Sequence, residues 1–140
     1  MAFTGNFTCN TFKTGLMNGT FNFTSGSFYL ALYTNSATLN EDTTAYTATG
    51  EASGGNYVAG GNLLTIAQVP TVGNGDTAFI SFNNTSWTGA ITARGALIYL
   101  SGGGNPAVCV LDFGADKTST ATFTVQFPAV TNTTAIIRLS

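Results

Sequence analysis

Hydrophobic and polar residues alternate with a period of two over most of the chain beyond Gly19. Phe21 and Phe23 alternate with polar neighbours, and the apolar residues of 122–127 do the same. This period is typical of β-strands with one buried face. Further strand-like stretches, separated by Gly, Asn and Pro residues, are 28–34, 63–69, 77–82, 93–100, 107–113 and 135–139. About seven to nine short strands at this spacing predict an all-β fold, an antiparallel β-sandwich or a jelly-roll-like barrel.

The only helical pattern lies near the N-terminus. Apolar residues spaced by four predict a short helix over 10–18, with Asn10 or Thr11 positioned to cap its start. Gly19 favours a stop there, because glycine accepts the left-handed conformation of a helix C-cap. The fold class is therefore all-β with one short N-terminal helix.

The stretch 28–34 is apolar on both faces. A strand of this kind is covered twice, by its own core and by something on the other side. We expect the second face to pack on the N-terminal helix or on another subunit. The aromatic residues expected at such an interface are Phe21, Phe23, Tyr29, Tyr33 and Trp87.

Residues 35–56 form a long polar stretch that holds three of the six acidic residues. Loops of this length in compact domains are usually functional or ordered by a partner. The acids, with Asn side chains and backbone carbonyls, offer oxygen ligands for calcium, although no Asp-x-Asp-x-Asp-Gly series is present. Trp87, Tyr46 and Tyr57 are candidates for stacking on sugars, with core or interface packing as the alternative.

Arg94 is the most informative charge, because it lies within an apolar strand. The Gly-rich turn 101–105 predicts a hairpin, and a register that pairs Ile98 with Val108 places Arg94 opposite Asp112. An arginine buried alone is costly, so we predict an Arg94–Asp112 ion pair that fixes this register. The alternative is that Arg94 contacts a carboxylate on a partner protein. Farther on, Asp116 is expected to cap a turn over 114–118.

Composition narrows the range of functions. The 140 residues suffice for one domain, 1–140, and only 7% are charged, against about 25% in ordinary soluble domains. Four basic residues are too few for a nucleic-acid surface. Without histidine the chain lacks Ser-His-Asp or Cys-His catalysis and His-metal sites. We therefore expect that the chain is not an enzyme and that it binds no cofactor. The neutral polar side chains that replace the charges are mainly 25 Thr, 13 Asn and 9 Ser.

Targeting signals and cysteines complete the picture. The N-terminus lacks a basic region followed by an apolar one, so no secretory signal is expected. No stretch approaches the roughly 18 apolar residues of a membrane span, and no membrane partner is expected. Cys9 and Cys109 are predicted to be free thiols, the second of them a small core hydrophobe.

The linear order of several blocks carries a resemblance. The blocks are, in order, MAFTGNFTCNTFKTGLMNGTFNF, FYLALYTNSATLNEDTTAY, NYVAGG, Trp87-Thr-Gly, TARGALIY, VLDFG and the closing FPAVTNTTAIIRLS. Together they resemble a family of small virion structural proteins of tailed bacteriophages, in order and spacing over almost the whole chain. The resemblance implies that the protein is made in the host bacterial cytoplasm and becomes part of the virion.

We therefore expect a capsid decoration (cement) protein on the capsid surface, with the major capsid protein and further copies of itself as partners. Low charge and strands that are apolar on both faces favour a protein that works within an assembly. Two alternatives stay open: a tail, neck or fibre component of the virion, and a host-surface carbohydrate-binding module.

Overall fold

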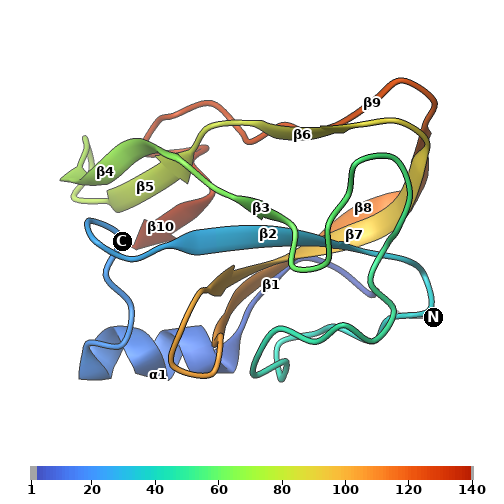
Figure 1. The fold of residues 1–140 in the computed structure, drawn as a ribbon. Helices are drawn as coiled ribbons and strands as arrows, with labels where there is room; N and C mark the ends of the chain where they lie inside the picture. The colour runs from blue at the N-terminus through green and yellow to red at the C-terminus, as the bar shows by residue number, and fades with distance from the viewer. Residues whose placement is uncertain (1–2, 140) are drawn as a thin grey trace.

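The computed structural model describes residues 3–139 and shows a mostly β fold with one short helix (Figure 1). The predicted all-β class is confirmed. The largest sheet has five antiparallel strands in the order β1-β8-β7-β2-β3. Their bounds are β1 Phe7–Thr8, β8 Ala107–Ser119, β7 Ile91–Leu100, β2 Phe28–Tyr33 and β3 Asn62–Leu63. Among the described residues this sheet does not close into a barrel.

Two smaller sheets complete the β structure. One has the order β10-β5-β4, and the other is the two-stranded ribbon β6-β9. Their bounds are β10 Ile137–Leu139, β5 Ala78–Phe82, β4 Ile66–Val72, β6 Thr85–Thr88 and β9 Thr122–Val125. Figure 1 shows β4, β5, β6 and β9 above the five-stranded sheet, and the helix with the long loop below it. The fold is an open sandwich with a partial third layer.

The helix α1 spans Asn10–Asn18, the range that the sequence predicts. Its N-cap is Cys9 rather than Asn10 or Thr11, and no side chain caps it. Gly19 ends the helix with a φ of 81°, in the left-handed region. The buried Phe12 packs edge-on against Phe21 and Phe23, in the segment between α1 and β2, at ring distances of 5.0 and 5.8 Å.

Both faces of β2 are covered within the chain. On one face Phe28 stacks on Phe23 at 4.5 Å. On the other, Tyr29 lies beside Tyr99 of β7, which stacks on Tyr46 of the long loop at 4.9 Å. That loop is ordered by its own chain, so its order needs no partner.

The β7–β8 hairpin differs from the predicted register by one residue. Ile98 pairs with Cys109, not Val108, and Gly95 rather than Arg94 lies opposite Asp112. The ladder is interrupted between Gly95 and Ala93, where β8 carries three more residues than β7 and bulges. Next to the Gly-rich turn the predicted register holds, since Tyr99 pairs with Ala107. An irregularity at Val108, between that pair and the Ile98–Cys109 pair, shifts the rest of the ladder by one residue.

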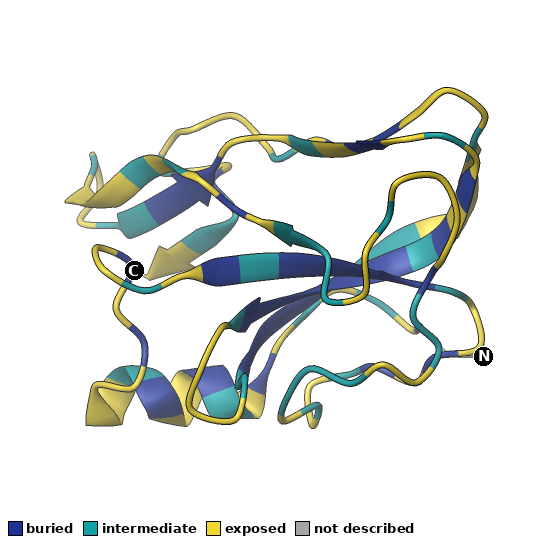
Figure 2. Ribbon diagram, in the orientation of Figure 1, coloured by how far each residue is buried: buried dark blue, intermediate teal, exposed yellow. Residues whose placement is uncertain are grey.

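The strand β8 continues through the segment predicted as a turn. It runs to Ser119, and Gly114 has a φ of 83° at the bulge. The residues after Phe113 are exposed or half-buried on both faces, so no alternation marks them as a strand (Figure 2). The proposed turn over 114–118 with an Asp116 cap is therefore wrong.

Candidate functional site

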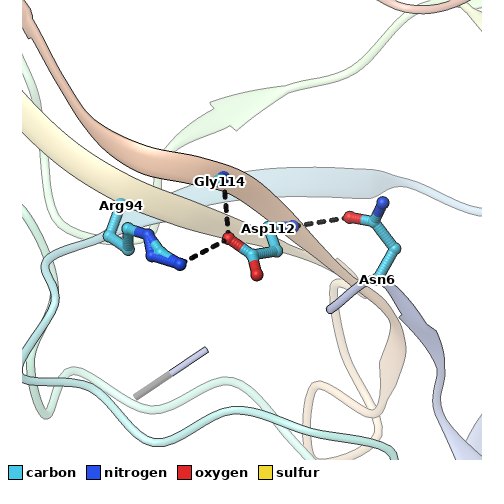
Figure 3. Close-up of polar contacts among 4 residues, drawn as sticks. All are labelled: Asn6, Arg94, Asp112 and Gly114. Atoms are coloured by element: carbon cyan, nitrogen blue, oxygen red, sulfur yellow. Dashed lines mark hydrogen bonds and ion pairs between the residues drawn. The ribbon is translucent and has the colours of Figure 1, made fainter. Parts of the chain in front are cut away.

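Arg94 and Asp112 form the predicted ion pair (Figure 3). The Arg94 Nη2 lies 3.2 Å from the Asp112 Oδ1, and the two side chains are 11% and 12% exposed. The same Oδ1 accepts the backbone N–H of Gly114 at 2.8 Å. The Asp112 N–H donates to the Oδ1 of Asn6 at 2.6 Å. Although the register is shifted by one residue, the long Arg94 side chain reaches its partner across the bulge, so the pair fixes the bulge rather than a regular register.

A shallow pocket of about 330 Å³ lies beside this pair. It is lined by Asn35, Arg94, Gly114, Ala115 and Asp116. The Nε of Arg94 is buried without a hydrogen-bond partner in the described part of the chain. Since Asp112 already neutralises the guanidinium and little of the side chain is exposed, the geometry favours the structural interpretation over a partner carboxylate.

A second polar cluster surrounds Glu51, which the sequence did not single out. Its Oε1 accepts the Tyr46 hydroxyl at 2.7 Å, and its Oε2 accepts the Tyr57 hydroxyl at 2.6 Å and the Gly60 N–H at 2.7 Å. The Tyr57 oxygen in turn accepts the N–H of Leu32 at 2.9 Å. The Glu51 cluster, defined as these residues with Tyr99, ties the loop to the edge of β2.

The tyrosines of this cluster resist ionisation. Burial, followed by the negative charge of Glu51, raises the pKa of Tyr99 to about 12. Burial and the hydrogen bond to Glu51 raise the pKa of Tyr46 and of Tyr57 further. A phenol that donates to a carboxylate must keep its proton, so the hydrogen bonds to Glu51 form only while the tyrosines are neutral.

The aromatic residues predicted at an interface lie inside this chain instead. Phe21, Phe23, Tyr33 and Trp87 are buried, and Tyr29 is half-buried. Trp87 is 2% exposed and lies against Tyr57 at 5.4 Å. The interface assignment of these four residues is therefore wrong, because their side chains are buried within the chain. For the same reason, Trp87 presents no free ring face to a sugar, whereas Tyr57 and Tyr46 are half-buried.

The two cysteines are buried, and the acids and cysteines of residues 3–139 do not gather into a metal site. Cys9 and Cys109 are buried and free, as predicted. Burial raises the pKa of Cys9 to about 11 and of Cys109 to about 12, so both remain protonated at neutral pH. Within residues 3–139 no three acids or cysteines come together as metal ligands. None of the helical structure in that range is long and apolar enough to cross a bilayer.

The exposed features are sheet edges and grooves. One groove of about 410 Å³ lies between the outer part of β8 and β9, with Phe113, Phe123 and Val125 in its lining. An apolar pocket of about 280 Å³ lies between α1 and the β10-β5-β4 sheet. Sequence reasoning missed the first groove because it placed a turn where β8 continues.

Comparison with known proteins gives no relative: no family model, no curated protein and no solved structure matches the chain.

Proposed function

We propose that this protein is a structural subunit of a tailed-bacteriophage virion that decorates the capsid and stabilises the head. The observation that carries the proposal is the ordered series of sequence blocks that resembles small phage virion proteins. In the fold, LALYT lies in β2, ARGALIY in β7, VLDFG in β8 and YVAGG in the loop beside the Glu51 cluster. These four blocks thus lie in the central sheet and in the loop at its edge.

The surface chemistry supports an assembly role. The exposed large hydrophobic residues are Met17, Val58, Leu63, Val69, Val72, Val130 and Leu139. They lie among neutral Thr, Asn and Ser side chains, with few charges to keep neighbouring subunits apart. A decoration protein that binds only assembled capsid subunits stabilises the assembled state by mass action.

Binding to undecorated heads tests the proposal. Purified protein is added to heads of the encoding phage that lack it, at low salt and at about 1 M salt, where the Debye length is near 3 Å. Because few charges are available, we expect co-sedimentation to survive high salt. Release at high salt or absence of binding removes the decoration role. Localisation to the tail would then indicate a tail component, and glycan-array binding a carbohydrate-binding module.

A further inference from the structure

Two cavities adjoin between α1 and β10, the strand that Figure 1 shows above the helix. The apolar pocket of about 280 Å³ and a second cavity of about 630 Å³ have four lining residues in common, and all four are apolar. The shared residues are Phe12, Leu16, Ile137 and Leu139. We refer to the two cavities together as the α1–β10 cleft. Its dimensions are close to those of small-molecule binding sites, which measure roughly 300–1,000 Å³.

The end of the cleft beside β5 is apolar. Its further lining residues include Phe21, Phe23, Phe79 and Ile80. The polar exceptions among the described residues are Asn22 and Thr24, and the Asn22 Oδ1 already accepts the Thr24 N–H at 2.8 Å. Leu139 is 57% exposed, so the chain itself covers this apolar lining incompletely. An alkyl chain that enters this end would leave water without leaving a polar group unpaired.

The other end of the cleft is positively charged. Lys13 of α1 and Arg138 of β10 line it, and neither forms an ion pair within residues 3–139. The Lys13 Nζ donates to the Asn10 Oδ1 at 3.3 Å, whereas the Asp42 carboxylate accepts from the Asn10 Nδ2. No Asp or Glu in the described part of the chain lines either cavity. Two of the four basic residues in a chain of net charge −2 therefore lie at one cleft, and they favour an anionic group there.

We propose that the α1–β10 cleft binds a fatty acid, with the alkyl chain in the apolar pocket and the carboxylate at Lys13 and Arg138. An apolar tail joined to a single anionic group matches the chemistry of the two ends of the cleft. A peptide segment fits less well, because its amide groups would lie against the apolar lining without hydrogen-bond partners. The binding does not depend on the role in the virion.

A chain-length series measured by isothermal titration calorimetry tests the alkyl end with the wild-type protein. The ligands are octanoate, decanoate and dodecanoate at neutral pH, each below its micelle concentration. We expect saturable binding of one ligand per chain, with the dissociation constant falling about fourfold for each added methylene group that is buried. In NMR spectra, the methyl resonances of Leu16, Ile137 and Leu139 should shift on binding, and those of Val58, outside the cleft, should not.

Charge variants test the carboxylate end. Lys13 and Arg138 are exposed, so Lys13→Gln and Arg138→Gln leave the core unchanged. Each should weaken octanoate binding by about two- to fivefold, as expected for one exposed ion pair, and the variant with both substitutions should bind more weakly still. The affinity for 1-octanol, the uncharged match of octanoate, should be unchanged. Lys117→Gln makes the same change of charge outside the cleft and should leave both affinities as in the wild type.

Three results would overturn the proposal. The first is the absence of saturable binding of dodecanoate at about 1 mM, a concentration that populates even weak complexes. The second is a K13Q/R138Q variant that is folded by circular dichroism and binds octanoate as tightly as the wild type, because the cleft would then have no anion site. The third is a shift of the same methyl resonances with protein concentration alone, which would show that a second copy covers the cleft.

Discussion

Two edge regions of the five-stranded sheet differ in how completely their backbone groups are paired. On one side, the edge of β2 is covered by β3, by the loop around Glu51 and by the bridge between Tyr33 and Glu51. On the other, the outer half of β8 is exposed, and β9, which follows β8 along the chain, pairs with β6 alone among the described strands. We refer to these as the covered edge and the free edge. The contrast shows that the chain pairs the backbone of β2 along its edge and leaves the outer half of β8 without a strand partner on one side, among the described residues.

Along the covered edge, backbone groups of β2 form hydrogen bonds with the neighbouring loop. The N–H of Ala52 donates to the Leu32 carbonyl, and the Thr34 N–H donates to the Gly50 carbonyl, both along β2. Farther along, the Asn62 side chain donates to the Thr85 hydroxyl at 2.9 Å and so connects β3 to β6. Gly61 approaches the Leu30 carbonyl so closely that no side chain fits there, and its φ is 81°. The backbone of β2 thus has partners on both sides, and addition of a further strand is blocked.

The largest expected effect is at the centre of the covered edge. Glu51→Ala removes the acceptor of three donors, so the Tyr46 and Tyr57 hydroxyls and the Gly60 N–H lose their partner. We expect a loss of about 2–4 kcal/mol in the free energy of unfolding, since hydrogen bonds to charged groups are the stronger ones. The urea unfolding midpoint measures it.

The matched control is Glu41→Ala. Glu41 is exposed, and its backbone carbonyl, not its side chain, accepts the Asn10 N–H. This variant should unfold within about 0.5 kcal/mol of the wild type. Equal unfolding midpoints for the two variants would contradict the role assigned to Glu51.

Alkaline pH should weaken the covered edge next. The pKa of Tyr99 is raised from 10.0 to about 12. Below pH 10 the phenol is neutral in both states and the stabilisation is complete. Above pH 10 the unfolded chain releases protons that the folded chain retains, so stability falls as pH rises toward 12, by about 1.4 kcal/mol per pH unit for this group. Tyr99→Phe should show a shallower loss between pH 10 and 12 in urea melts, and an unchanged slope would exclude Tyr99 as a source.

The ion pair where β8 leaves its regular pairing should have a smaller effect. Arg94→Met removes the partner of a mostly buried carboxylate, but the Oδ1 of Asp112 keeps the Gly114 N–H. We expect a loss of about 1–2 kcal/mol in unfolding free energy, less than for a fully buried pair. A double-mutant cycle with Asp112→Asn isolates the coupling, and additive effects of the two substitutions would show that the pair contributes nothing.

The sequence predicts the covered parts of this fold better than the exposed ones. The helix over 10–18 and the core strands follow from apolar spacing, because burial imposes a periodic pattern. Strand β8 beyond Phe113 carries no such pattern, since its outer half is exposed on both faces, and a turn was predicted there. The three-residue stretch of β10 is likewise shorter than the predicted 135–139.

The candidate sites divide in the same way. The Arg94–Asp112 pair could be predicted, because a charge within an apolar strand needs a partner wherever the register falls. The Glu51 cluster could not, since its members come from loop and strand positions that only the tertiary fold brings together. The buried interface aromatics were misassigned for a related reason: the sequence shows that β2 needs a second cover, but not that residues 35–50 provide it.

The smallest effect is expected at the free edge, and it completes the comparison. Asp116→Lys and Lys117→Asp alter exposed side chains that make no ion pair within residues 3–139, so each should change the unfolding free energy of the monomer by less than about 0.5 kcal/mol. Urea melts of the two variants and of the wild type measure this difference. A loss above about 1.5 kcal/mol in the free energy of unfolding would mean that these two side chains stabilise the fold. If stability is unchanged, the fold does not depend on the charges at this edge, whereas it depends on the charge of Glu51, which three donors share.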